Sequence, residues 1–279
     1  MKLFAFADEA DPSLQGQIRA MKRNALDGLE IRAVDGENVS VITLEKAREI
    51  RKAMDDAGLV TWSIGSPIGK IKLLEDDFVS DVEKLKHTIE VADVLGAERI
   101  RLFSFRMPKG ADPAIYKNEV IDRMGVYQEC AERSGVLLCH ENEKNIYGDT
   151  ADRCFEILQA IPGIKGVFDP ANFVQCGEDT LYAWKLLRDR IDYMHIKDAL
   201  SDGTVVPPGE GEGNVKTIVS EYLADGKDRF TMEPHLYSFS ALKVIEEKGH
   251  TSRVGENNRF ANADEAFDFA VRTFRSLIA

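Results

Sequence analysis

The chain has 279 residues, and its 44% hydrophobic and 30% charged residues are typical of a folded, soluble protein with a substantial core. Its formal net charge of −12 would repel a phosphate backbone, which argues against nucleic acid and anionic membranes as partners. Acidic residues begin at Asp8, too early for a secretory signal, and no apolar run approaches the ~20 residues of a membrane span. We therefore predict a cytoplasmic protein without a membrane or nucleic-acid partner.

Strand-like segments alternate with stretches of helical spacing from one end of the chain to the other. Each is a short apolar run rich in β-branched and aromatic residues. The eight segments are residues 3–7, 28–34, 58–64, 97–105, 135–141, 164–170, 191–198 and 229–235.

Three of the intervening helices carry clear end signals. Residues 82–96 have apolar residues at three- and four-residue spacing and end at Gly96, a typical residue just past a helix. Residues 147–163 have Asp149 or Thr150 as the N-cap. Residues 262–279 have Asn262 as the N-cap, and one predicted apolar face consists of Ala266, Phe269, Ala270, Phe274 and Leu277.

Alternating strands and helices indicate a parallel sheet, and eight strands in a chain of this length favour a closed (β/α)₈ TIM barrel. A doubly wound open sheet is the alternative. It is disfavoured because the sequence FADEADPS, rather than a glycine-rich turn, follows the first strand. No linker or break in composition divides the chain, so we predict a single domain over residues 1–279. The four cysteines have no CxxC spacing, and we expect free, buried thiols.

Polar residues stand at the carboxyl ends of four consecutive strands. In a TIM barrel these ends carry the reactive groups, and alternate residues of each strand point into the barrel. This alternation gives each of the four strands an inward residue that can bind a metal. The four candidates are Glu141, Asp169, His195 and Glu233.

A divalent ion explains why three carboxylates would converge. At ~4 Å in a low-dielectric pocket they would repel one another, and one would have to remain protonated. A single such residue is more often a helix cap or a solvated group, but the joint arrangement favours a metal site. Oxygen-rich ligation with one imidazole suits Mn²⁺ or Mg²⁺, with Co²⁺ or Zn²⁺ as further candidates.

Other polar residues near these strand ends are candidates for binding substrate. Lys197 shares the face of His195 and could donate to a substrate oxygen or pair with Asp198, and His235 could bind hydroxyl groups or pack within a loop. We expect His140 to point toward the helices, because it has the opposite parity to Glu141, and Glu143 to lie beyond the strand.

Two residues of the earlier strands are also candidates. Glu30 and Arg32 share a parity and could bind the far end of the substrate, a role favoured for Glu30, or form an ion pair inside the barrel. Trp62 could provide an apolar floor for sugar C–H groups or belong to the core.

The ordered motifs CHEN, FDPANF, HIKD, GEGEG and MEPH resemble those of the xylose isomerase-like TIM-barrel superfamily of sugar phosphate isomerases and epimerases. This resemblance covers most of the chain. It implies a divalent metal bound by Glu141, Asp169, His195 and Glu233, in agreement with the strand-parity argument. In the ketose epimerase branch the two glutamates flank the reacting carbon and move the proton, and here these are Glu141 and Glu233.

The resemblance implies an enzyme that acts on a small sugar or cyclitol. Removal of a proton next to a carbonyl gives an enediolate, which a divalent metal stabilises. Return of the proton to the opposite face gives epimerisation, and return to the adjacent carbon gives isomerisation. Epimerases of this branch often have a histidine where this chain has Asn172, which can bind a sugar hydroxyl but cannot titrate. A dehydratase of keto-inositols or related keto-sugars is therefore an alternative.

Two more distant functions are also open. An endonuclease for abasic DNA would need more than the five histidines present and a basic groove, and a non-catalytic sugar-binding protein would need no metal. The long segment 237–260 could form a lid or the contact of a homodimer.

Overall fold

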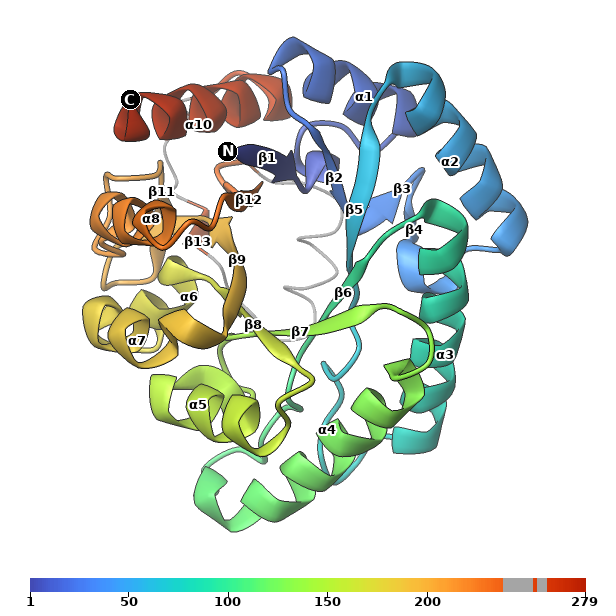
Figure 1. The fold of residues 1–279 in the computed structure, drawn as a ribbon. Helices are drawn as coiled ribbons and strands as arrows, with labels where there is room; N and C mark the ends of the chain where they lie inside the picture. The colour runs from blue at the N-terminus through green and yellow to red at the C-terminus, as the bar shows by residue number, and fades with distance from the viewer. Residues whose placement is uncertain (238–252, 255–259) are drawn as a thin grey trace.

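The computed structural model describes residues 1–237, 253–254 and 260–279 of the chain. Eight parallel strands close into a barrel, in the order β1, β12, β9, β8, β7, β6, β5, β2, which confirms the predicted (β/α)₈ fold (Figure 1). The barrel strands are β1 (Lys2–Ala5), β2 (Gly28–Ile31), β5 (Val60–Gly65), β6 (Arg99–Leu102), β7 (Leu137–Glu141), β8 (Lys165–Phe168), β9 (Ile191–Ile196) and β12 (Arg229–Met232).

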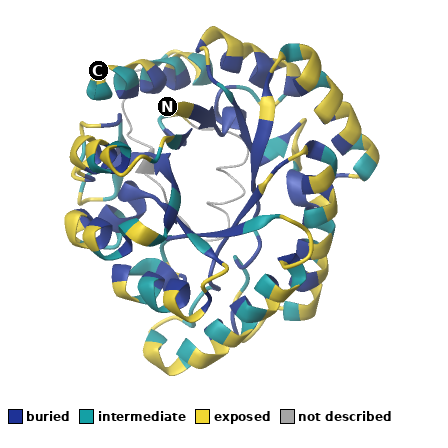
Figure 2. Ribbon diagram, viewed as in Figure 1, coloured by how far each residue is buried: buried dark blue, intermediate teal, exposed yellow. Residues whose placement is uncertain are grey.

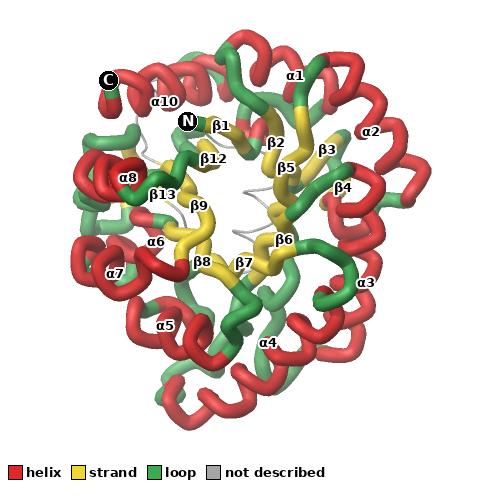
Figure 3. Tube along the Cα trace, viewed as in Figure 1, coloured by secondary structure: helices red, strands yellow, loops and turns green. Residues whose placement is uncertain are grey.

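Helices form a ring outside the strands (Figure 3). Figure 2 shows that their buried residues face the barrel and their exposed residues face outward. The described helices are α1 (Leu14–Arg23), α2 (Leu44–Ala57), α3 (Phe78–Leu95), α4 (Lys117–Ala131), α5 (Ala151–Ala160), α6 (Pro170–Gln175), α7 (Thr180–Leu187), α8 (Val215–Ala224) and α10 (Ala263–Ile278).

The predicted helix ends agree with the structure in most details. Gly96 follows α3 in the left-handed conformation, with φ +72°, and Thr150 rather than Asp149 caps α5 by accepting a hydrogen bond from the Arg153 amide. Asn262 caps α10. The buried face of this last helix differs from the predicted one, because it includes Phe267 and Val271, whereas Phe269 and Leu277 are only half-buried.

A small apolar cluster fills the lower part of the barrel interior. Side chains from strands that are not neighbours meet there, and the ring of Trp62 stacks on Phe4 at 4.5 Å and contacts Tyr193 edge-on at 5.0 Å. Cys139 and Val167 belong to the same cluster. Because Cys139, Val167 and Tyr193 point inward, the residues two positions later, Glu141, Asp169 and His195, point inward as well, at the carboxyl end of the barrel.

The loop after β9 is tied to the barrel by one carboxylate. Asp198 is fully buried in β10 (Asp198–Ala199), and its oxygens accept hydrogen bonds from four backbone amides, those of Ala199, Gly209, Gly211 and Gly213, at 2.9–3.1 Å. The motif GEGEG is thus the glycine-rich partner of Asp198. The alternative pairing of Lys197 with Asp198 is not present.

Shorter strands lie at the carboxyl end of the barrel. β3 (Ala33–Val34) and β4 (Glu37–Asn38) form a hairpin, and β10 pairs with β11 (Thr204–Val206), which pairs in turn with β13 (Arg253–Val254). Most of segment 237–260 lies outside the described residues, so its proposed role as a lid or dimer contact stays a prediction.

Two other expectations concern cysteines and membranes. All four cysteines are free, as expected, but only Cys139 and Cys154 are buried, and Cys130 and Cys176 are half-buried. Burial raises the pKa of Cys139 and Cys154 well above the usual thiol value. Among the described helices none is long and apolar enough to cross a membrane.

Candidate metal centre and active-site cavity

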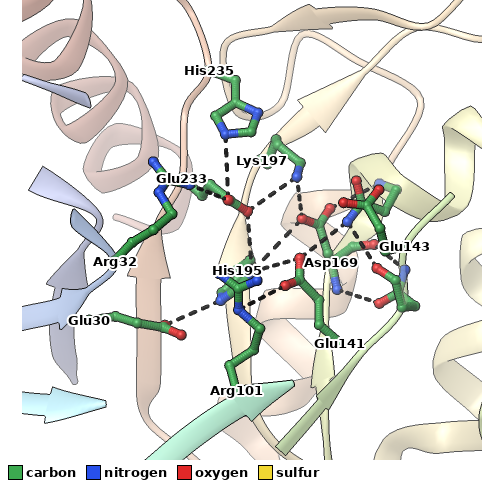
Figure 4. Close-up of polar contacts among 12 residues, drawn as sticks. Glu30, Arg32, Arg101, Glu141, Glu143, Asp169, His195, Lys197, Glu233 and His235 are labelled. Atoms are coloured by element: carbon green, nitrogen blue, oxygen red, sulfur yellow. Dashed lines mark hydrogen bonds and ion pairs between the residues drawn. The ribbon is translucent and has the colours of Figure 1, made fainter. Parts of the chain in front are cut away.

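The four predicted metal ligands converge at the carboxyl end of the barrel. Glu141 ends β7, His195 lies in β9, and Asp169 and Glu233 directly follow β8 and β12. Their ligand atoms all lie within 4.8 Å of one another, and all four residues are buried (Figure 4). The Nδ1 atom of His195 lies 3.2 Å from Glu141 Oε1, 3.2 Å from Glu233 Oε2 and 3.9 Å from Asp169 Oδ2.

This cluster fits a divalent cation. Oδ2 of Asp169 and Oε2 of Glu141 accept no hydrogen bond from the described residues, although a cationic side chain lies near each. Burial raises the pKa of Asp169 to about 7, and the charges of Glu233 and Glu141 oppose its ionisation further. Three carboxylates and one imidazole are a donor set for hard or borderline ions, so the residues present can hold a metal such as Mn²⁺, Mg²⁺, Co²⁺ or Zn²⁺.

Glu30 lies behind His195 rather than on the cavity wall. It is fully buried, its Oε2 lies 3.2 Å from His195 Nε2, and its Oε1 accepts a hydrogen bond of 2.7 Å from the Tyr193 hydroxyl. The predicted contact of Glu30 with substrate is therefore not supported by its position. Instead, Glu30 directs Nε2 of His195 away from the cluster, which leaves Nδ1 as the ligand atom.

The imidazole of His195 is surrounded by negative charge. Burial opposes its protonation, but Glu141, Glu30 and Glu233 outweigh burial and raise its pKa well above the usual value. Without a metal, a proton on Nδ1 therefore partly offsets the charge of the carboxylates. A cation at the cluster would take over this role.

Lys197 spans two of the ligands. Its ammonium group lies 2.6 Å from Asp169 Oδ2 and 3.2 Å from Glu233 Oε2, and only 4% of the residue is exposed. Burial opposes its charge, but Asp169 and Glu233 raise its pKa, so it remains an ammonium. Lys197 also borders the cavity described below, as expected for a residue that contacts substrate.

Each glutamate of the cluster is paired with its own arginine. Arg101 Nε lies 3.2 Å from Glu141 Oε2, and Arg32 Nη1 lies 3.0 Å from Glu233 Oε1. Burial opposes ionisation of both glutamates, yet their pKa values are lowered, chiefly by His195 at Glu141 and by Lys197 at Glu233. Both carboxylates are therefore charged in this structure.

Arg32, Asp8 and Glu9 form a group that the sequence interpretation missed. The short helix η1 (Ala7–Glu9) follows β1, and Arg32 lies 3.0 Å from Asp8 Oδ2 and 3.3 Å from Glu9 Oε1. Arg32 shares the parity of Glu30, as the sequence indicated, but its ion pairs join it to Asp8, Glu9 and Glu233. The position of Asp8 and Glu9 depends on the helical turn after β1, which had no clear sequence signal.

His235 packs against the same group. Its Nε2 lies 3.3 Å from Glu9 Oε1 and 3.4 Å from Glu233 Oε1, and its backbone amide donates to Glu9 Oε2 at 2.7 Å. The φ angle of His235 is +46°, an uncommon backbone conformation for this residue type. Burial lowers the pKa of its imidazole to about 4, so the ring is neutral and can donate or accept a hydrogen bond at the cavity wall.

Asn172 lies at the site but is largely used within the protein. Its Nδ2 donates to Glu141 Oε1 at 3.2 Å and to the Asn142 carbonyl at 2.9 Å. Its backbone amide donates to Oδ1 of Asp169, the N-cap residue of α6. Its Oδ1 accepts no hydrogen bond from described residues, and the residue lines the cavity. That oxygen is available to a substrate hydroxyl.

Three further predicted positions can be compared with the structure. Trp62 belongs to the apolar cluster in the lower barrel and does not line the cavity, so we assign it to the core. His140 points away from the ligands and hydrogen-bonds Ser104 Oγ at 2.9 Å, as expected. Glu143 lies beyond the end of β7, as expected, and it also borders the cavity, 2.9 Å from Lys70 Nζ.

The ligand cluster opens into a cavity of about 470 Å³, a size suited to a small molecule. Its walls come from residues that follow β2, β5, β6 and β7 and from Glu141, Lys197, Glu233 and His235. The cavity therefore adjoins a cluster that could bind a metal, and Glu141 and Glu233 of this cluster form part of its wall.

A parallel barrel with such a site at the carboxyl ends of its strands defines a class of TIM-barrel proteins. Residues 18–252 match the family model described as xylose isomerase-like TIM barrel, and the chain belongs to this family. The predicted resemblance is thereby confirmed.

Several solved structures share the fold over nearly the whole chain. The probable 3-DHS dehydratase AsbF from Bacillus anthracis is 17% identical, with a TM-score of 0.75 and coverage of 99% of both chains. The IOLI protein with a bound zinc atom is 17% identical, with a TM-score of 0.76 and coverage of 100% of this chain and 98% of the other.

A further similar structure is the D-psicose 3-epimerase from Clostridium cellulolyticum H10 with D-tagatose. It is 14% identical, with a TM-score of 0.75 and coverage of 100% of this chain and 99% of the other. The comparison with curated protein sequences finds no significant match. At these identities the structural similarity establishes the fold.

Proposed function

We propose that the protein is a divalent-metal-dependent sugar isomerase or epimerase that moves a proton on the carbon next to a carbonyl. The observation that carries the proposal is the convergence of Glu141, Asp169, His195 and Glu233 within 4.8 Å of one another, with Glu141 and Glu233 also lining the cavity. The epimerase and the zinc-containing IOLI protein among the similar structures support the same class of reaction and a metal.

A divalent ion at this cluster would polarise the substrate carbonyl and so make the neighbouring C–H group more acidic. Asp169 and His195 hold the cluster together, and Lys197 donates a hydrogen bond to a substrate oxygen. Asn172 and His235 border the cavity where they can contact hydroxyl groups. These residues position the sugar with its reacting carbon near the two glutamates.

Glu141 and Glu233 are the proposed proton carriers. They come from strands that are not neighbours, and Figure 4 shows them on different sides of His195. One carboxylate takes the proton from the carbon, and for epimerisation the other returns a proton to the opposite face. Return of the proton to the adjacent carbon would give the isomer.

A dehydratase acting on a keto-inositol or related keto-sugar is the second candidate. Two observations favour it: Asn172 cannot titrate, and the similar structure of AsbF is that of a probable dehydratase. In this reaction a glutamate removes the proton beside the carbonyl, and Lys197 gives a proton to the departing hydroxyl group, which leaves as water. Lys197 suits this role because it is a buried ammonium group at the cavity.

The test combines metal analysis with NMR of candidate ketoses and inososes in deuterated water. We expect bound Mn²⁺ or a related ion, and deuterium incorporation at the carbon next to the carbonyl that stops when the metal is chelated. Glu233→Gln should lower the exchange rate at least a hundredfold, because general acid–base catalysis contributes about 10²–10⁴-fold. Loss of water instead of exchange would identify the dehydratase.

Glu83→Gln is the matched control, because this exposed residue of α3 pairs with Lys86 on the surface. It should exchange deuterium at the wild-type rate. A metal-loaded protein that exchanges no substrate, or an unchanged rate in Glu233→Gln, would refute the proposal.

A further inference from the structure

The cavity has the opposite charge balance to the chain as a whole. The protein carries a formal charge of −12, yet seven lysine and arginine residues and only four carboxylates line the cavity. A divalent ion at the ligand cluster would add to the positive charge. Cavities lined by one sign of charge concentrate ligands of the other sign, so this one favours an anionic molecule.

The positive charge is concentrated on one wall. Arg32, Lys197 and Arg101 each pair with a carboxylate of the candidate metal cluster. Arg101 also belongs, with Lys70, Arg106 and Lys144, to the cations at or beyond the ends of β5, β6 and β7. Glu143 is the carboxylate of this wall and lies 2.9 Å from Lys70 Nζ and 3.7 Å from Lys144 Nζ. One carboxylate thus faces several cations.

Lys70 and Arg101 are brought together by an aromatic ring. The Lys70 ammonium lies 4.1 Å from the ring centre of Phe103, and the Arg101 guanidinium carbon lies 4.5 Å from it. The ring holds both cations through cation–π contacts without neutralising them. Two fixed positive groups therefore lie close together at one end of the cavity.

Arg101 has hydrogen-bonding capacity that the protein does not use. Its side chain is only 5% exposed, and its one ion pair joins Nε to Glu141 Oε2 at 3.2 Å. Its guanidinium donates no hydrogen bond to any residue among those described, and Nε is buried without such a partner. A buried guanidinium with five donors is rarely left unsatisfied, and its planar fork matches a carboxylate or phosphate group.

We propose that Arg101 and Lys70 form a subsite for an anionic oxygen group of the substrate, a carboxylate or a phosphate, beside the metal cluster. This inference rests on the proposed function, because it places the reacting carbon at Glu141 and Glu233 and the anionic end of the sugar at Arg101. The substrate class is then a sugar acid or a sugar phosphate rather than a neutral sugar.

The test uses three probes that have no aldehyde or keto group, so that no reaction occurs. They are D-glucitol, D-gluconate and D-glucitol 6-phosphate. Calorimetric titration of the Mn²⁺-loaded protein should show at least one anionic probe binding tenfold or more tightly than D-glucitol. The anionic probe with the higher affinity distinguishes a carboxylate from a phosphate. Equal affinity for all three probes would overturn the proposal.

Variants test which residues cause the preference for an anionic probe. Arg101→Met should remove the preference for the anionic probe, Arg101→Lys should restore part of it, and Lys70→Met should reduce it at least threefold. Arg51→Met removes the same charge from the exposed face of α2 and should leave the preference unchanged. If Arg101→Met does not fold, the Lys70→Met variant is the deciding measurement, and an anionic preference equal to that of wild type in this variant refutes the subsite.

The two proposals can fail separately. Selective anion binding without deuterium exchange on any keto-sugar would contradict the proposed reaction but not the subsite. Exchange with neutral ketoses that is as fast as with sugar acids and sugar phosphates, and equally fast in Arg101→Met, would contradict the subsite but not the reaction.

Discussion

Glu30 is placed to select the nitrogen of His195 that faces the candidate metal cluster. Its carboxylate lies 3.2 Å from Nε2, on the side away from Glu141 and Glu233, and is itself held by Tyr193. Carboxylates in this position orient the imidazole and increase its basicity as a ligand. Glu30 is therefore a positioning residue, although it has the same inward parity as the residues that line the site.

Glu30→Gln should weaken Mn²⁺ binding by about 10–100-fold, because the amide holds the ring less strongly and can present its NH₂ group to Nε2. Calorimetric titration with Mn²⁺ measures this affinity directly. The KM for substrate at saturating metal should change little, since Glu30 does not line the cavity. An Mn²⁺ affinity equal to that of wild type would show that Glu30 has no role at the centre.

Trp62→Ala distinguishes a core residue from a substrate contact. The indole stacks on Phe4 and contacts Tyr193, so its removal leaves a hole in the lower barrel. We expect a loss of about 3–5 kcal/mol in the free energy of unfolding, measured by urea denaturation. The KM of the folded variant should stay at the wild-type value. A large rise in KM with unchanged stability would instead show that Trp62 contacts the substrate.

At the scale of elements, Asp198 is the anchor of the loop after β9. Its four backbone hydrogen bonds hold residues 209–213 against the end of the strand. A side chain at Gly211 would place Cβ 2.3 Å from Asp198 Oδ1, so the loop requires glycine there. The loop and the carboxylate therefore form one unit.

Asp198→Ala should lower the free energy of unfolding by about 3 kcal/mol, because several backbone amides lose a charged acceptor. Limited proteolysis should then cleave the loop near residue 211 faster than in wild type. Asp55→Ala, on the exposed surface of α2, should change stability by less than about 0.5 kcal/mol. Wild-type stability and protease resistance in Asp198→Ala would contradict the anchoring role.

The sequence predicted the elements better than the contacts between them. Apolar runs located all eight barrel strands, and alternation along β7, β8, β9 and β12 identified the four residues of the candidate metal cluster. Arg101 and Arg32 obey the same rule on β6 and β2, but their partners follow from barrel closure. The strands β3, β4, β10, β11 and β13, of two or three residues each, are too short for a periodic signal.

At the scale of the whole molecule, metal binding and stability are linked. The cluster brings three buried carboxylates together, and a divalent ion that binds only the folded chain stabilises it by RT ln(1 + [M]/Kd). The carboxylates that could bind a metal repel one another when no metal is bound. The metal-free barrel should therefore be less stable than the metal-loaded one.

Removal of the metal should lower the free energy of unfolding by about 2.7 kcal/mol relative to protein in Mn²⁺ at one hundred times Kd. Urea denaturation with and without chelator measures the difference. Asp169→Asn should abolish it, since asparagine can still cap α6 but is a weak metal ligand. An equal gain from Mn²⁺ in Asp169→Asn would place the ion elsewhere.

The separate arginine partners of Glu141 and Glu233 also bear on engineering. The guanidinium groups of Arg101 and Arg32 approach different carboxylates, so each arginine is a separate position at which to change the basicity of its glutamate. Replacing Arg32 would make Glu233 more basic and leave the arginine of Glu141 in place. In the proposed reaction this would change kcat and KM for the two stereochemical directions, while the ratio of their kcat/KM values stays fixed by the equilibrium constant.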